Sequence, residues 1–373
     1  MNPAVAAVDA AVAGGLGSAA ALAFGDAAAE RVRHLVGRTR RVPDLGPAIT
    51  AATRFDLASL TKPMATATLA LALASDGALE LDAPVARWLP GTAAAAGATV
   101  AQLLGHGAGT IAHGRYFEAI AGGDLAGAST PRAALIAHAA REPLAAAPGT
   151  VACYSDVGYV LLGALLERVG DAPLEELVAA RVMAPLGLAA GFVPLPTATP
   201  LVDVVATELD DLAPGPDPVD GRTGRRGLVV GEVHDENAHA GGGVAGHAGL
   251  FGTLDDVVGF ARAMLALARG EAPGGLDPAL ARRCWTTPAA PGTSWRLGWD
   301  TPSSTPGVSH AGDAWPRTDA IGHLGFTGTS LWLDLAGGRY CVLLTNRIHP
   351  RRDGTADAIR ALRRAVGDAA MAP

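Results

Sequence analysis

Strand-like segments lie near both ends of this chain, and helix-like segments fill the middle. Short apolar runs bounded by turn residues predict strands. The expected strands cover residues 19–24, 31–38, 322–326, 329–335 and 340–346, with a hairpin turn at Gly337-Gly338. Because backbone groups of a strand need partners, strands from both ends are expected to share one antiparallel sheet. We predict an α/β (more strictly α+β) fold in which helices flank this sheet.

The helices expected between the strands form a second, inserted lobe. Apolar spacing and Gly/Pro boundaries predict helices at residues 4–13, 60–75, 100–104, 131–141, 156–169, 174–183, 254–268 and 355–366. Residues 190–232 are rich in Pro, Gly and Asp and are expected to cross the surface, with a short helix near 203–212. We predict one domain over residues 1–373, with an α/β lobe at about 1–58 and 240–373 and a helical lobe at about 59–239.

Composition excludes several classes of protein. A formal net charge of −7 argues against a nucleic-acid-binding surface. The three cysteines, Cys153, Cys284 and Cys341, fit neither a disulfide framework nor a zinc site, so buried thiols are expected. Residues 10–25 are too few and too weakly apolar to span a bilayer, and no basic segment precedes them as in a signal peptide. We expect a cytoplasmic protein, or a periplasmic or secreted one if its N-terminus was trimmed.

The chain contains a single lysine, Lys62, among 29 basic residues. It follows Ser59 by three positions, and residues three apart on a helix lie on one face. Pro63 is tolerated only in a first helical turn, so the helix is expected to begin near Ser59 or Leu60. The backbone N–H of Ser59 would then be free to bind an oxyanion. The apolar run at residues 64–74 is expected to bury Lys62 and lower its pKa, so that it accepts the serine proton.

Three motifs in order resemble one family. They are Phe55-Asp56-Leu57-Ala58-Ser59-Leu60-Thr61-Lys62-Pro63, then Tyr154-Ser155-Asp156, then His323-Leu324-Gly325. Together they resemble the serine β-lactamase and penicillin-binding protein superfamily, in its class C-like branch, over about residues 10–365. The resemblance implies a β-lactamase/transpeptidase-like fold and acyl transfer through a covalent intermediate on a serine, without a cofactor.

The resemblance also implies roles for these residues. Ser59 is expected to be the nucleophile and Lys62 its base, with Tyr154 sharing that role or returning a proton to the leaving group. Asp156 would orient Lys62 or the substrate amide. His323 would place a partly positive group near a substrate carboxylate or Tyr154. Backbone N–H groups of Ser59 and Phe326 would form the oxyanion hole, and Gly325 would let its strand approach the substrate.

Two residues depart from the commoner family pattern. Asp156 stands where Asn is more usual, and His323 where β-lactamases have Lys. Both departures put efficient antibiotic hydrolysis in doubt. The predicted function is a serine hydrolase of amides or esters, such as cell-wall muropeptide fragments. The alternatives are an esterase or a weak β-lactamase or D-Ala peptidase of the same fold, or a non-catalytic ligand-binding or sensor module.

A Gly-rich segment indicates which branch of this superfamily the chain resembles. Residues 233–238 and 241–251 resemble a branch that includes an N-acetylmuramyl-L-alanine amidase, and Asn237 is a candidate substrate-binding residue there. His234, Asp235, His239 and His247 match no metal-site spacing, so we expect a loop lining the cleft and no metal. His106 and His113 are expected to be structural. The expected partner is a small-molecule or peptide substrate, with no nucleic acid and no membrane span; the oligomeric state is not predicted.

Overall fold

The main sheet joins the two ends of the chain. The computed structural model describes residues 2–196, 200–210 and 227–372. Five antiparallel strands follow the order β2-β1-β10-β9-β8. They are β1 (Ala19–Asp26), β2 (Glu30–Gly37), β8 (Ala320–Leu324), β9 (Ser330–Asp334) and β10 (Arg339–Thr345). The central pair sets β1 against β10, with Phe24 opposite Cys341, so the predicted sheet from both ends is confirmed.

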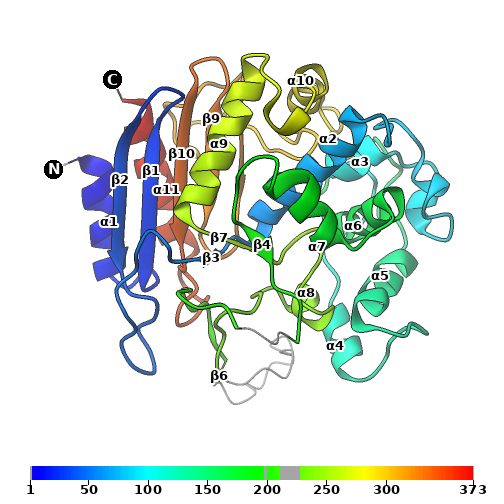
Figure 1. Ribbon diagram of the computed structural model, residues 1–373, viewed down its shortest axis with the longest axis horizontal. Coiled ribbons are helices and arrows are strands. Elements are labelled where there is room, and N and C mark those ends of the chain that lie inside the picture. The colour runs from blue at the N-terminus through cyan, green and yellow to red at the C-terminus, as the bar shows by residue number, and fades with distance from the viewer. Residues whose placement is uncertain (1, 197–199, 211–226, 373) are drawn as a thin grey trace.

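Helices cover both faces of this sheet (Figure 1). Helices α1 (Pro3–Ala13) and α11 (Ala356–Met371) pack together on one face, and α9 (Leu254–Ala268) lies across the other. Strand β1 begins Ala-Ala-Ala-Leu-Ala-Phe and is buried over nearly its whole length. Because alanine side chains are small, helices can pack closely on both sides of this strand. A sheet covered on both faces buries continuous apolar runs rather than alternating ones.

The remaining helices gather beside the sheet (Figure 1). They are α2 (Thr68–Ser75), α3 (Val100–Leu104), α4 (Tyr116–Ala121), α5 (Pro131–Arg141), α6 (Asp156–Gly170), α7 (Leu174–Val178), α8 (Glu236–Ala240) and α10 (Pro278–Thr286). A small sheet of order β3-β7-β4 comprises Phe55–Asp56, Leu250–Gly252 and Gly191–Phe192, and β5 (Leu209–Asp210) pairs with β6 (Gly227–Leu228). None of the helices in the described part of the chain is long and apolar enough to cross a membrane.

The segment that carries Ser59 and Lys62 is not the uniform α-helix that was expected. It begins as a 3₁₀ turn at Ala58–Leu60, continues as a π-type turn at Lys62–Ala67, and becomes α-helical only at α2. Pro63 has no N–H to donate, and the hydroxyl of Thr68 donates to its carbonyl oxygen at 2.7 Å. These features explain the altered hydrogen-bond spacing, which often marks functional sites.

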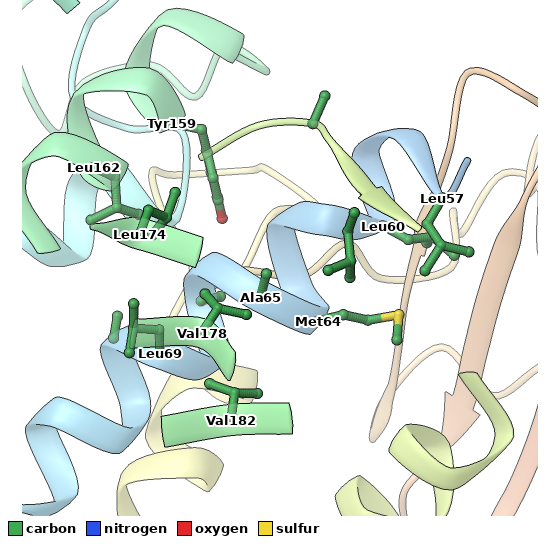
Figure 2. Close-up of a cluster of buried hydrophobic side chains, with 14 of the residues drawn as sticks. Leu57, Leu60, Met64, Ala65, Leu69, Tyr159, Leu162, Leu174, Val178 and Val182 are labelled. Carbon is green, nitrogen blue, oxygen red and sulfur yellow. The ribbon is translucent and has the colours of Figure 1, made fainter. Parts of the chain in front are cut away.

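Apolar packing fixes this segment in place. Leu60, Met64 and Leu69 are completely buried; Leu60 lies beside Leu57, and Leu69 lies near Val178 of α7 (Figure 2). Burial of each such side chain contributes about 1.5–3 kcal/mol. The turn that presents the nucleophile is therefore anchored by its hydrophobic continuation.

Several segments differ from expectation, and helices α4, α8 and α10 were not expected. No helix lies at residues 203–210, where β5 occupies the end, and 211–212 lie outside the described residues. Strand β8 ends at Leu324 because a tight turn follows, in which Gly328 N–H donates to the Gly325 carbonyl. Helix α11 extends to Met371, five residues beyond the expected end.

Candidate active site

A strained turn presents Ser59. Ala58, the residue before it, has a φ of 48°, a conformation that non-glycine residues seldom adopt. The buried carboxylate of Asp56 holds this turn, accepting hydrogen bonds from the N–H of Ala58 at 2.8 Å and of His234 at 2.7 Å. Thr61 adds a hydrogen bond to the Ala58 carbonyl at 2.6 Å. Such strain persists only when surrounding contacts enforce it, and here they fix Ser59 at the start of the 3₁₀ turn.

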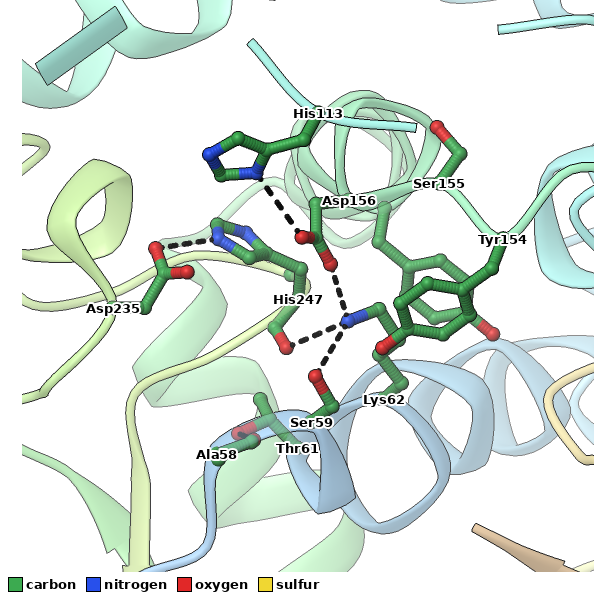
Figure 3. Close-up of polar contacts among 12 residues, drawn as sticks. Ala58, Ser59, Thr61, Lys62, His113, Tyr154, Ser155, Asp156, Asp235 and His247 are labelled. Atoms are coloured by element: carbon green, nitrogen blue, oxygen red, sulfur yellow. Dashed lines mark hydrogen bonds and ion pairs between the residues drawn. The ribbon is translucent and has the colours of Figure 1, made fainter. Parts of the chain in front are cut away.

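Lys62 is the hub of the polar network (Figure 3). Its side chain is completely buried, and Nζ lies 3.0 Å from Ser59 Oγ, 2.7 Å from Asp156 Oδ1 and 3.2 Å from the His247 carbonyl oxygen. An ammonium has three hydrogens, and each has one of these acceptors. The geometry therefore describes a protonated lysine that donates to the nucleophile.

Charge explains why Lys62 keeps its proton. Burial alone would lower the pKa of Lys62, but Asp156 and Tyr154, through charge and hydrogen bonds, together outweigh burial and raise this pKa. Burial would likewise raise the pKa of Asp156, but the positive charge of Lys62 and a hydrogen bond from His113 hold it well below its usual range. The expectation that burial lowers the lysine pKa is thus wrong for this site, because it omitted the carboxylate.

Tyr154 lies against the ammonium of Lys62. Its ring centroid is 4.7 Å from Lys62 Nζ, a cation–π distance. Burial and the charge of Asp156 raise the pKa of Tyr154 despite the opposing charge of Lys62. The tyrosine is therefore a proton donor in the free site, which favours the expected return of a proton to the leaving group over a share in the role of base.

His323 is neutral, contrary to expectation. It is the last residue but one of strand β8 and is buried, and burial together with the charge of Lys62 lowers its pKa to about 3. Its Nδ1 donates to the Leu324 carbonyl oxygen at 2.9 Å. His323 thus supplies no positive charge at physiological pH, and a binding change near pH 6.5 is not expected from it.

Gly325 and Phe326 form the turn after β8. A Cβ on Gly325 would lie 2.0 Å from Thr329 Oγ1 and 2.7 Å from the Leu57 carbonyl oxygen, so only glycine fits beside the nucleophile turn. Phe326 is 47% exposed, outside the strand, with its ring stacked on His234 and under the guanidinium of Arg347. Both residues line the same cavity as Ser59. The oxyanion role of the Phe326 N–H stays a prediction.

Asn237 does not reach the cavity. Its Oδ1 accepts from the Phe117 N–H at 3.0 Å, and its Nδ2 donates to the Gly114 carbonyl at 2.7 Å. The side chain therefore ties α8 to the start of α4 behind His113. The structure gives Asn237 a positioning role in place of the expected contact with substrate.

Sequence reasoning missed two features near Lys62. His113, expected to be structural, lines the cavity with Nδ1 3.3 Å from Asp156 Oδ2. His247 pairs its Nε2 with Asp235 at 2.8 Å, which orients the loop whose carbonyl receives Lys62. No group of three or more His, Cys, Asp or Glu side chains within the described ranges could hold a metal ion.

Arginines also line this cavity. The cavity has a volume of about 630 Å³, and its wall includes Ser59, Tyr154 and Asp156 as well as Arg347, Arg360 and Arg363. We call these last three the arginine end. Arg363 is buried on α11 and donates to the carbonyls of Gly325 and Thr329, both at 2.8 Å. Burial and the charge of Arg347 lower the pKa of Arg363 to about 9. The i, i+3 spacing of Arg360 and Arg363 on the closing helix was the available sequence signal.

The site combines a serine, a lysine one turn later, a tyrosine beside that lysine, and an edge strand followed by a glycine turn. Together they define a serine acyl-transfer hydrolase. Comparison with known proteins agrees with this class. A family model described as Beta-lactamase matches residues 8–365, and the chain belongs to that family.

Relatives and solved structures share this fold. A "Putative D-alanyl-D-alanine carboxypeptidase" of Escherichia coli (strain K12) is 32% identical over 318 residues, which cover 80% of this chain and 70% of the relative. A protein of the same description from Salmonella enteritidis is 31% identical, covering 80% and 71%. The structure of "EstCE1, a hydrolase with promiscuous acyltransferase activity" has a TM-score of 0.72 at 22% identity, covering 99% of this chain and 98% of that one. An octameric penicillin-binding protein homologue from Pyrococcus abyssi has a TM-score of 0.70 at 20% identity, covering 96% and 76%.

Proposed function

We propose that this enzyme hydrolyses, through an acyl-Ser59 intermediate, an amide bond close to a free carboxylate in a small peptide. The observation that carries the proposal is the arginine end. Within the described part of the chain, none of Arg347, Arg360 and Arg363 forms an ion pair with a carboxylate, yet all face the cavity that contains Ser59. Guanidinium groups bind carboxylates through paired hydrogen bonds. The description of the relatives as D-alanyl-D-alanine carboxypeptidases supports a substrate of this kind.

The chemistry follows from the hydrogen bonds already described. When Lys62 loses a proton, it can keep its bonds to Asp156 and the His247 carbonyl and turn its lone pair toward Ser59. Ser59 Oγ then attacks the carbonyl carbon as its proton moves to Nζ. Tyr154 donates its proton to the leaving nitrogen and recovers one from Lys62. Water completes the cycle by hydrolysing the acyl-enzyme.

The test compares a peptide ending in D-Ala-D-Ala with the same peptide as its C-terminal amide. We expect release of D-Ala from the acid, much slower cleavage of the amide, and no cleavage by Ser59→Ala. A fluorophosphonate probe should label Ser59, as intact-mass analysis would show. Equal rates on acid and amide would refute the carboxylate assignment, and labelling that survives Ser59→Ala would refute the nucleophile.

An esterase is the second candidate. The observation that favours it is the neutral His323 in place of a cationic residue, and a hydrolase with acyltransferase activity shares the fold. Turnover of neutral esters with no turnover of either peptide would select it. Stable labelling of Ser59 without turnover of any substrate would instead favour a sensor module.

A further inference from the structure

The ring of His323 has a fixed tautomer. Its Nδ1 lies 2.9 Å from the Leu324 carbonyl oxygen, which can only accept a hydrogen bond, so Nδ1 must carry the hydrogen. The ring is neutral, because burial and the positive charges of Lys62 and Arg363 lower its pKa more than the Leu324 hydrogen bond and the charge of Asp156 raise it. A neutral imidazole has one N–H. The other nitrogen, Nε2, is therefore an unprotonated acceptor.

This acceptor is buried and unsatisfied. His323 is 2% exposed, and Nε2 has no hydrogen-bond partner among the described residues. Leaving a buried acceptor without a partner is unfavourable, and most such groups in proteins are paired. His323 lines the cavity that contains Ser59, with the rings of Tyr154 and Trp295 beside it at centroid distances of 6.0 Å and 5.7 Å. A ligand in the cavity can therefore supply the missing donor.

We propose that His323 selects substrates by accepting a hydrogen bond from an N–H group next to the acylated carbonyl. The proposal rests on the proposed hydrolase function. It assigns two groups of the substrate, a carboxylate and an N–H, to two different parts of the cavity wall. A substrate carboxylate belongs at the arginine end, because Nε2 and a carboxylate oxygen are both acceptors. At His323, the favoured substrate presents a donor, such as the amide N–H of an N-acylated amino acid.

The experiment uses two neutral esters that differ at one hydrogen. One is the 4-nitrophenyl ester of N-acetyl-D-alanine, and the other is its N-methyl analogue, which lacks the N–H. Both report acylation of Ser59 without needing a carboxylate. We expect wild-type kcat/KM to be about 10- to 100-fold lower for the N-methyl ester, since its binding leaves the acceptor unpaired.

Variants at position 323 distinguish the effect of the hydrogen-bond acceptor from the effect of the size of the ring. His323→Phe keeps an aromatic ring but removes the acceptor, and we expect its preference between the two esters to fall below about 3-fold. His323→Gln, whose side-chain oxygen can accept, should restore part of the preference. Thermal melting and fluorophosphonate labelling of Ser59 identify correctly folded variants. His310 also lines the cavity and also has a buried nitrogen, Nδ1, without a partner among the described residues, so His310→Phe tests it as the alternative acceptor and should keep the wild-type preference.

Each outcome decides the proposal. Equal kcat/KM of the wild type on the two esters, or an undiminished preference in folded His323→Phe, would overturn it. Failure to cleave D-Ala-D-Ala peptides with the ester preference intact would reject the proposed substrate and leave the acceptor established. A preference lost equally in His310→Phe would assign the effect to His310 or to the shape of the cavity and overturn the role of Nε2.

Discussion

Replacing Asp156 by Asn should lower the pKa of Lys62 and extend activity to lower pH. The carboxylate lies 2.7 Å from Nζ and is the charge that opposes burial of the lysine. At an effective dielectric of about 20, that separation corresponds to about 6 kcal/mol of attraction. His113 shares the carboxylate through its other oxygen, so we take the usual effect of a close opposite charge, about 1–3 pKa units.

The direction of the shift in the pH profile follows from which protonation state of Lys62 reacts. If Ser59 needs unprotonated Lys62, kcat/KM falls on the acid side of the Lys62 pKa. Asp156→Asn should move that acid limb down by about 1–3 pH units. A neutral ester is the substrate, because the change in charge should not then alter substrate attraction.

The single lysine allows a direct measurement. Protein labelled with [¹³Cε]lysine has one lysine resonance, whose shift with pH reports the Lys62 pKa in wild type and Asp156→Asn. Asp357→Asn removes another carboxylate of the cavity wall, on α11, and should move neither the resonance nor the rate profile. A lysine pKa that drops while the acid limb stays in place would show that Lys62 is not the limiting base. An unchanged pKa would refute the electrostatic argument itself.

Three further changes test neighbouring contacts. Lys62→Arg should be nearly as damaging as Lys62→Ala, about 10²–10⁴-fold in kcat, because arginine cannot act as a base; retained turnover would make position 62 an electrostatic anchor. His113→Ala removes the hydrogen bond from His113 to Asp156, leaves more of the carboxylate charge to Lys62, and should shift the acid limb up by less than about one pH unit, as the half-exposed site is screened; a downward shift would contradict this. Gly325→Ala forces a Cβ against Thr329 Oγ1 and should cost about 1–3 kcal/mol of stability, with slower Ser59 labelling; an unchanged melting temperature would show that the turn can yield.

The sequence predicted those elements that depend on contacts between residues close together in the chain. Helix α9 has the predicted bounds because Thr253 and Asp256 form a capping box at its start and an apolar face follows. The pairing of both ends followed from strands that had no other partners. Ser59 and Lys62 were brought together by helical spacing, although the turn is 3₁₀ and π-type rather than α-helical.

The features of the site that the sequence did not predict depend on contacts between distant parts of the chain. Asp156 is 94 positions from Lys62, and nothing in either local sequence reveals the 2.7 Å contact that reverses the pKa shift. Asn237 resembled a binding residue, but its hydrogen bonds with residues 114–117 appear only once α8 packs against α4. The tautomer of His323 depends on the orientation of one carbonyl at the end of β8.

The two departures from the family pattern act on the catalytic lysine in the same direction. Asp156 in place of Asn adds a negative charge 2.7 Å from Lys62, and neutral His323 in place of Lys leaves out a positive charge. Both changes increase the affinity of Lys62 for its proton and make the region around Ser59 less attractive to an anion. A carboxylate-bearing substrate therefore needs its positive charge elsewhere, and the arginine end supplies it within the same cavity. Because the positive charge of Lys62 and that of the arginine end belong to different residues, carboxylate binding and lysine protonation can vary independently. His323→Lys should couple them again, because the new charge would lower the pKa of Lys62 and draw anions toward Ser59.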